Sequence, residues 1–130
     1  MTIRTLYLVA AAVEGATGLA LVIYPSVVTE LLLGEGVSGV GTALGRVAGF
    51  ALVSLALACW PSHTNGGGDT SGLRAMLSYN LLVTLYLLLL GIGGESVGKL
   101  LWPAFAVHAV LTLLLGRAWF DKTPAPGSAA

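Results

Sequence analysis

Four side chains in this 130-residue chain are costly to place in an apolar environment, and each lies in a different hydrophobic stretch. They are Glu14, Arg46, Asn80 and His108. A carboxyl group and an imidazole can exchange protons, a guanidinium can pair with a carboxylate, and an amide both donates and accepts hydrogen bonds. Polar residues inside hydrophobic segments are expensive and often functional. Together these four could bind a proton, an ion or a small ligand.

The composition explains why these residues stand out. Hydrophobic residues make up 56% of the chain and charged residues 9%, whereas soluble domains usually carry about 25% charged residues. Six Lys+Arg balance six Asp+Glu, which argues against a nucleic-acid partner. The single cysteine, Cys59, allows no intrachain disulfide. We therefore expect an integral membrane protein whose main partner is the lipid bilayer.

Four apolar stretches are long enough to cross a bilayer as helices. Each is close to the roughly 20 residues that a hydrocarbon core of about 30 Å requires, and the alternation typical of a membrane β-barrel is absent. The stretches cover residues 5–24, 42–60, 73–92 and 100–120. The predicted fold class is therefore all-α: an integral membrane four-helix bundle, formed by a single domain over residues 1–121.

One connection between the spans is predicted to contain a short helix. Pro25 ends the first span, and the following segment, residues 26–34, is apolar on one side. Ser26 is the expected N-cap of this helix and Gly34 its C-cap. Nine residues are too few to span, so we expect the helix to lie in the membrane interface. The other irregular segments are predicted to be a flexible loop at 61–72, a tight turn at 91–98 and a disordered tail at 122–130.

The cations predict an orientation in the membrane. With the N-terminus inside, only Arg46 and Lys99 fall towards the outer side. The other four lie on the cytoplasmic side: Arg4, Arg74, Arg117 and Lys122. This distribution follows the positive-inside rule. We therefore predict a multi-pass protein of a bacterial inner membrane with both termini in the cytoplasm.

The four polar residues are predicted to approach one another near the centre of the bundle. Glu14, Asn80 and His108 each lie within about two residues of the middle of their spans. Arg46 starts about 7 Å from its midpoint, and its long side chain can extend inward to Glu14 or outward to the headgroups. An unpaired carboxylate at this depth would cost about 3 kcal/mol. We therefore expect Glu14 to be protonated, hydrated or paired with Arg46.

Three further polar residues extend this candidate site. Residues four apart on a helix share a face, which places Thr84 beside Asn80 and Thr112 beside His108. Tyr79 lies next to Asn80 in the same span. The predicted ligand or proton site therefore also includes Tyr79, Thr84 and Thr112.

Several functions are compatible with this site. The sequence favours binding or transport of a small ligand, ion or proton, with Glu14 as the carrier. Arg46 would be its counter-ion or an anion clamp, His108 a second titrating group, and Asn80 would orient its partners. A polar network that only fixes helix register, a homo-oligomer, and an assembly subunit of a larger membrane complex are structural alternatives. No nucleophile–base pair or metal-ligand set is legible, so no catalytic residue, metal or cofactor is predicted. A membrane enzyme acting on a lipid or quinone is a further alternative.

In its length, its four spans and the acidic residue of its first span, the chain resembles small multidrug-resistance transporters. In that family the membrane glutamate exchanges protons for cationic drugs, so the resemblance implies a proton-carrying role for Glu14. The family's Trp-Gly pattern in the third helix has no counterpart in residues 81–90, and Arg46 would oppose a cationic substrate. The resemblance therefore serves as an analogy.

A second resemblance rests on longer stretches of sequence. The segments EGATGLALVIYP, GRVAGFALVSLALACWP and LLWPAFAVHAVLTLLL are similar to those of many small four-helix bacterial membrane proteins, including DoxX-like ones. This likeness covers the hydrophobic spans and implies no activity.

Overall fold

The computed structural model describes residues 2–60, 70–94 and 97–122, and every regular element within them is a helix. A short helix, α2 (Pro25–Leu33), follows the first of four long ones. The long helices are α1 (Ile3–Ile23), α3 (Val40–Ala58), α4 (Thr70–Gly93) and α5 (Leu101–Lys122). These four helices have the length and the apolar composition needed to cross a membrane. The chain is therefore a small multi-pass membrane protein built as a four-helix bundle, as predicted.

The ends of α2 differ in part from the prediction. Gly34 ends the helix in the left-handed conformation, with φ 86°, as expected of a glycine C-cap. The prediction for Ser26 was wrong, because α2 begins one residue earlier, at Pro25, and Tyr24 is its N-cap. Proline suits the first helical turn, since its missing N–H would have no partner there. The helix therefore starts at the residue that also interrupts α1.

The other predicted boundaries can be compared with the helices only in part. The four predicted spans differ from the long helices by one to three residues at each end. Helix α5 continues through Lys122, the first residue of the predicted tail. The predicted loop at 61–72 and turn at 91–98 were wrong in part, because α4 already begins at Thr70 and continues to Gly93. The rest of the predicted irregular structure falls mainly on segments outside the described residues: 61–69, 95–96 and 123–130.

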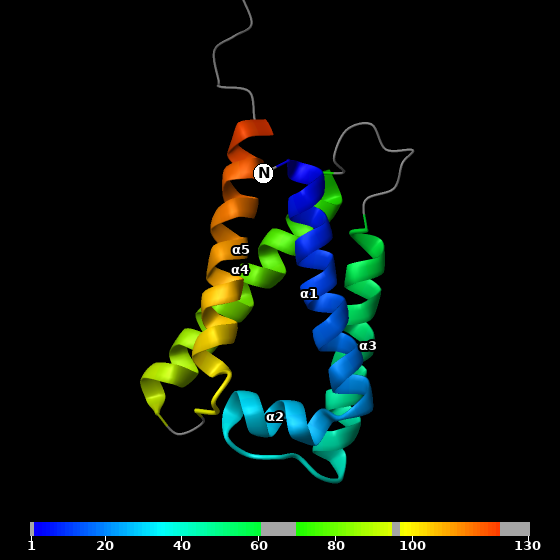
Figure 1. Cartoon of the computed structure of the whole chain (residues 1–130), viewed down its shortest axis with the longest axis vertical. Helices are drawn as coiled ribbons and strands as arrows, with labels where there is room; N and C mark the ends of the chain where they lie inside the picture. The colour runs from blue at the N-terminus through cyan, green and yellow to red at the C-terminus, as the bar shows by residue number, and fades with distance from the viewer. Residues whose placement is uncertain (1, 61–69, 95–96, 123–130) are drawn as a thin grey trace, which may run out of the picture.

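The four long helices form two close pairs (Figure 1). Helix α1 packs along α3, and α4 packs along α5, whereas contacts between the pairs are sparse. Helix α2 lies across one end of the bundle, between the lower ends of the two pairs in Figure 1. The N-terminal end of α1 and the C-terminal end of α5 lie together at the opposite end. Any site shared by α1 and the second pair must therefore form between the pairs.

The backbones of α1 and α3 touch directly at two glycines. A Cβ atom added at Gly18 would lie 2.8 Å from the carbonyl oxygen of Gly49, and one added at Gly49 would lie 2.6 Å from that of Gly18. Real Cβ contacts are longer, so both positions require glycine. Small residues allow this close approach between membrane helices, where dispersion contacts replace the hydrophobic effect. The crossing fixes the depth of α1 relative to α3.

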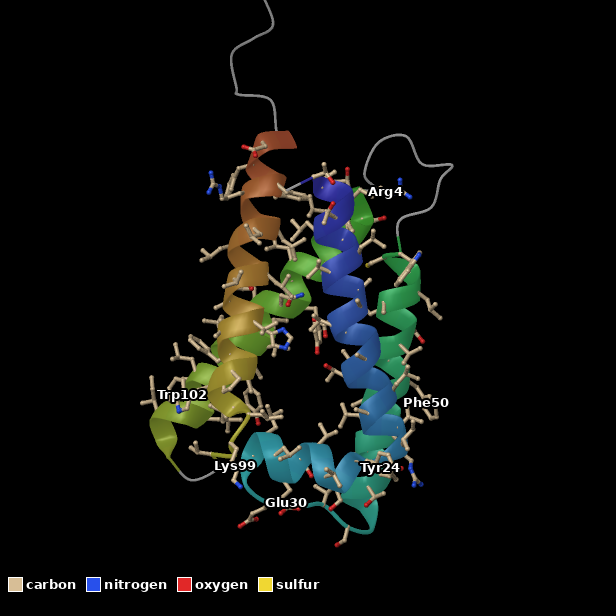
Figure 2. All side chains as sticks on the ribbon, viewed as in Figure 1. Arg4, Tyr24, Glu30, Phe50, Lys99 and Trp102 are labelled. Carbon is tan, nitrogen blue, oxygen red and sulfur yellow. The ribbon has the colours of Figure 1, made fainter. Side chains whose placement is uncertain are left out.

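The buried hydrophobic core lies at the end of the bundle that holds the N-terminus. All four long helices contribute to it, so this cluster joins the two pairs. Its members are Leu6, Tyr7, Ala10, Ala11, Ala56, Cys59, Leu73, Met76, Leu111 and Leu115. Many large apolar side chains elsewhere face outward; Phe50 of α3 and Trp102 of α5 are examples (Figure 2). This outward surface is what lipid contact requires.

At the opposite end, α2 is hydrogen-bonded to the segment that precedes α5. The N–H of Gly98 donates to the carbonyl of Leu32 at 3.1 Å, and the N–H of Leu100 donates to that of Leu31 at 2.7 Å. These carbonyls belong to the last turn of α2, where backbone carbonyls have no N–H partner inside the helix. A Cβ at Gly98 would collide with the Leu31 carbonyl. Helix α2 thus links the α1–α3 pair to the α4–α5 pair.

Candidate functional site

Three buried polar side chains meet between the two helix pairs. Glu14 comes from α1, Asn80 from α4 and His108 from α5, each near the middle of its helix. Their exposed fractions are 0%, 0% and 8%. Within the described parts of the chain, no other strongly polar or charged side chain is buried. The helices that carry these residues are apolar, so the three groups have mainly one another as polar neighbours.

The amide of Asn80 fixes the hydrogen-bonding role of His108. Asn80 Nδ2 donates to the backbone carbonyl of Met76, one turn earlier in α4, at 3.0 Å. Only the nitrogen of an amide group can donate to a carbonyl, so Oδ1 is the atom that faces His108. His108 Nδ1 lies 2.8 Å from this oxygen and must therefore carry the hydrogen. In a neutral ring, the lone pair is then on Nε2.

Glu14 is completely buried, yet neither of its carboxyl oxygens has a hydrogen-bonding partner among the described residues. Its Oε1 lies 3.7 Å from Nδ1 of His108, which is within ion-pair distance but too long for a hydrogen bond. Tyr79 and Asn80 also face this carboxyl group, but neither meets it with hydrogen-bonding geometry. Most buried polar atoms in proteins are paired, so this exception needs a physical reason.

The three additional residues predicted for the site surround it in different ways. The hydroxyl of Thr84 donates to the carbonyl of Asn80 at 2.7 Å, and that of Thr112 donates to the carbonyl of His108 at 2.8 Å. The two hydroxyl oxygens lie 3.4 Å apart and connect α4 with α5. The Tyr79 ring stands edge-on to His108, with ring centroids 6.1 Å apart. The threonines thus support the two helices, whereas Tyr79 contacts the imidazole.

Arg46 does not join the other predicted site residues. Its side chain is exposed, and its Nε donates to the backbone carbonyl of Val22 at 3.3 Å. Val22 lies in the last turn of α1, where carbonyls lack helical partners and carry partial negative charge. The guanidinium therefore finds an acceptor near the end of the bundle. The expected ion pair between Arg46 and Glu14 is not formed.

The sequence-based prediction also missed one component of the site, the backbone carbonyl of Met76. The signal was available in principle, because an asparagine inside a helix can donate to the carbonyl four residues earlier. No three His, Cys, Asp or Glu side chains in the described part of the chain gather closely enough to hold a metal ion. The functional groups at the site are therefore a carboxyl group and a neighbouring imidazole N–H. Such a pair can bind a proton or a hydrogen-bond donor.

No protein-family model, curated protein or solved structure matches this chain. The likeness of its first span to small multidrug-resistance transporters therefore remains an analogy.

Proposed function

We propose that this membrane protein reversibly binds a proton on Glu14, near the middle of its helices, and that this site serves proton transfer or proton-coupled transport. The observation that carries the proposal is the buried carboxyl group whose two oxygens are both unpaired. A carboxyl group that only held helices together would be expected to make hydrogen bonds to them. One that exchanges a proton needs at least one oxygen free to accept it.

His108 and Asn80 support both states of this carboxyl group. The His108 N–H is 2.8 Å from Asn80 Oδ1 and 3.7 Å from Glu14 Oε1. When a proton leaves a carboxyl oxygen of Glu14, the negative charge attracts this N–H. A movement of less than about 1 Å brings it into hydrogen-bonding range. When the proton returns, Asn80 again accepts the N–H, so His108 and Asn80 act as positioning residues.

The position of Arg46 favours a proton over an anion as the ligand. Arg46 is the cation that the sequence placed nearest in depth to Glu14, and its hydrogen bond to Val22 holds it at the end of α1. A site without a fixed positive charge attracts a proton or a small cationic hydrogen-bond donor, and it has no means of balancing an anion.

Infrared spectroscopy of the purified protein tests this proposal. The carbonyl-stretch band of a buried protonated carboxylic acid should be present at low pH and disappear as the pH rises, because a proton leaves Glu14. In Glu14→Gln this pH-dependent band should be lost completely. Glu30→Gln is the matched control, since Glu30 is exposed on α2 and its removal should leave the band unchanged. An identical band in wild type and Glu14→Gln at every pH would refute the proposal.

We also propose that the protein works in the inner membrane of a bacterium with both termini in the cytoplasm. Three exposed arginines support this orientation at the end that holds the N-terminus: Arg4, Arg74 and Arg117. The likeness of the spans to small bacterial membrane proteins supports the location. Alkaline phosphatase fused after residue 130 should be inactive in cells, and green fluorescent protein fused there should fluoresce. The opposite pair of results would reverse the orientation.

A further inference from the structure

We propose that water, and with it the exchanging proton, reaches Glu14 from the end of the bundle covered by α2, while the opposite end is closed. This inference rests on the proposed function, because it concerns the route to the same carboxyl group. The three site residues lie near the middle of their helices, so their position alone does not say from which end the site is reached. The proposal assigns that direction.

The first observation is that the hydrophobic core lies entirely on one side of the site. In α1 its members precede Glu14, and in α4 they precede Asn80, whereas in α5 they follow His108. The helices alternate in direction, so these positions all lie towards the end that holds the N-terminus. The core packs all four long helices together there. Closely packed apolar side chains leave no room and no hydrogen bonds for water.

The second observation concerns the α2 side, where two buried residues have close neighbours within their own helix pair. Gly18 is buried against Gly49 and Leu52, which belong to the α1–α3 pair. Leu101 is buried in the α4–α5 pair, where it contacts the position of Gly91. Among the residues that the structure describes, no cluster of buried side chains on this side joins one pair to the other.

The α2 end is instead bridged by α2 itself, through backbone hydrogen bonds from Gly98 and Leu100. This link consists of backbone hydrogen bonds at the end of the bundle, and no buried apolar cluster among the described residues accompanies it. The unpaired oxygens of Glu14 are polar groups that water can satisfy. Access from the α2 end explains how a completely buried carboxyl group keeps unpaired oxygens while the core beside it stays dry.

Cysteine labelling in proteoliposomes tests this direction. Ala104 lies four residues before His108 on the same face of α5, towards α2, and is half-buried. Ala10 lies four residues before Glu14 on the same face of α1, within the core, and is 0% exposed. Ala104→Cys and Ala10→Cys are thus matched substitutions on either side of the site. Both are made with Cys59→Ser, whose hydroxyl can replace the thiol as a hydrogen-bond donor.

The probe is a charged, membrane-impermeant methanethiosulfonate, which reacts with thiolates in water. Glu35→Cys and Arg4→Cys, both exposed and at opposite ends, report which end of the protein faces the reagent. We expect Ala104→Cys to be labelled from the side that labels Glu35→Cys and to be protected from the other side. Ala10→Cys should resist labelling from both sides. Leu21→Cys, about two turns after the carboxyl group in α1 and half-buried, provides a second position on the α2 side.

The direction of access is overturned if Ala10→Cys is labelled from the Arg4 side, or if neither Ala104→Cys nor Leu21→Cys is labelled from the α2 side. This outcome is distinguishable from failure of the proposed function. If the infrared band assigned to Glu14 titrates but the α2 side is closed, the proton site stands and the route is wrong. If the α2 side is open and the band is absent, the route stands without a proton site.

Discussion

Replacing Glu14 by leucine is expected to make the protein more stable while abolishing its proton binding. Both oxygens of this buried carboxyl group lack hydrogen-bonding partners, and an unsatisfied buried polar group costs about 1–3 kcal/mol. Leucine removes that cost, because it has no polar atom that the bundle or an entering water molecule must satisfy. We therefore expect the free energy of unfolding in a detergent titration, followed by tryptophan fluorescence, to rise by about 1–3 kcal/mol in Glu14→Leu.

The matched control is Asn80→Leu, which removes another completely buried polar side chain at the same site. Asn80 Oδ1 accepts the N–H of His108, so its loss leaves this buried donor without its acceptor. We expect this substitution to lower the free energy of unfolding by about 1–3 kcal/mol. If Glu14→Leu is instead destabilised as strongly as Asn80→Leu, the carboxyl group serves to hold the bundle together, and a structural role replaces the proposed one.

Replacing Gly49 by alanine is expected to have the second large effect, on the packing of α1 against α3. The added Cβ would lie 2.6 Å from the carbonyl oxygen of Gly18 and 2.9 Å from the backbone nitrogen of Val22. Backbone atoms cannot rotate away as the end of a flexible side chain can, so the helices must separate. Overpacking of this kind costs about 1–3 kcal/mol, which the same detergent titration would measure.

Gly116→Ala provides the control for this substitution. Gly116 also lies inside a long helix, α5, but a Cβ there would meet only Leu77, at 4.0 Å. Alanine favours the helix by up to about 1 kcal/mol over glycine, so Gly116→Ala should be neutral or more stable. If the free energy of unfolding falls equally in both variants, the backbones of α1 and α3 are not in direct contact at Gly49.

The helices could be predicted because the bilayer imposes their length. A span must satisfy its backbone internally and cover the hydrocarbon core, so runs of apolar residues mark its limits closely. The pairing of the helices could not be predicted in the same way. Apolar side chains face both lipid and protein in this chain, and the glycines at positions 18 and 49 indicate a close crossing only once the partner helix is known.

The site was predicted in part, for reasons that concern side-chain length. The side chains of Glu14, Asn80 and His108 are shorter than that of arginine, so their polar atoms stay near the depth of their own backbone in the membrane. Equal depth therefore predicts that the three groups lie close together. Arg46 has a long side chain that reaches in either direction. Its choice depends on the unpaired carbonyl of Val22 at the end of α1, a feature created by the fold. A similar non-local contact, from Gly98 to Leu32, completes α2.

The hydrogen bonds that complete α2 imply an order of assembly. A ribosome delivers α1, α2 and α3 to the membrane before it has made residues 98 and 100. Until then, the last carbonyls of α2 have only water or headgroups as partners, and the first helix pair is open on the side that will face the second. These two hydrogen bonds therefore form only after α4 and the segment that precedes α5 have been made, and they join the first-made half of the protein to the second.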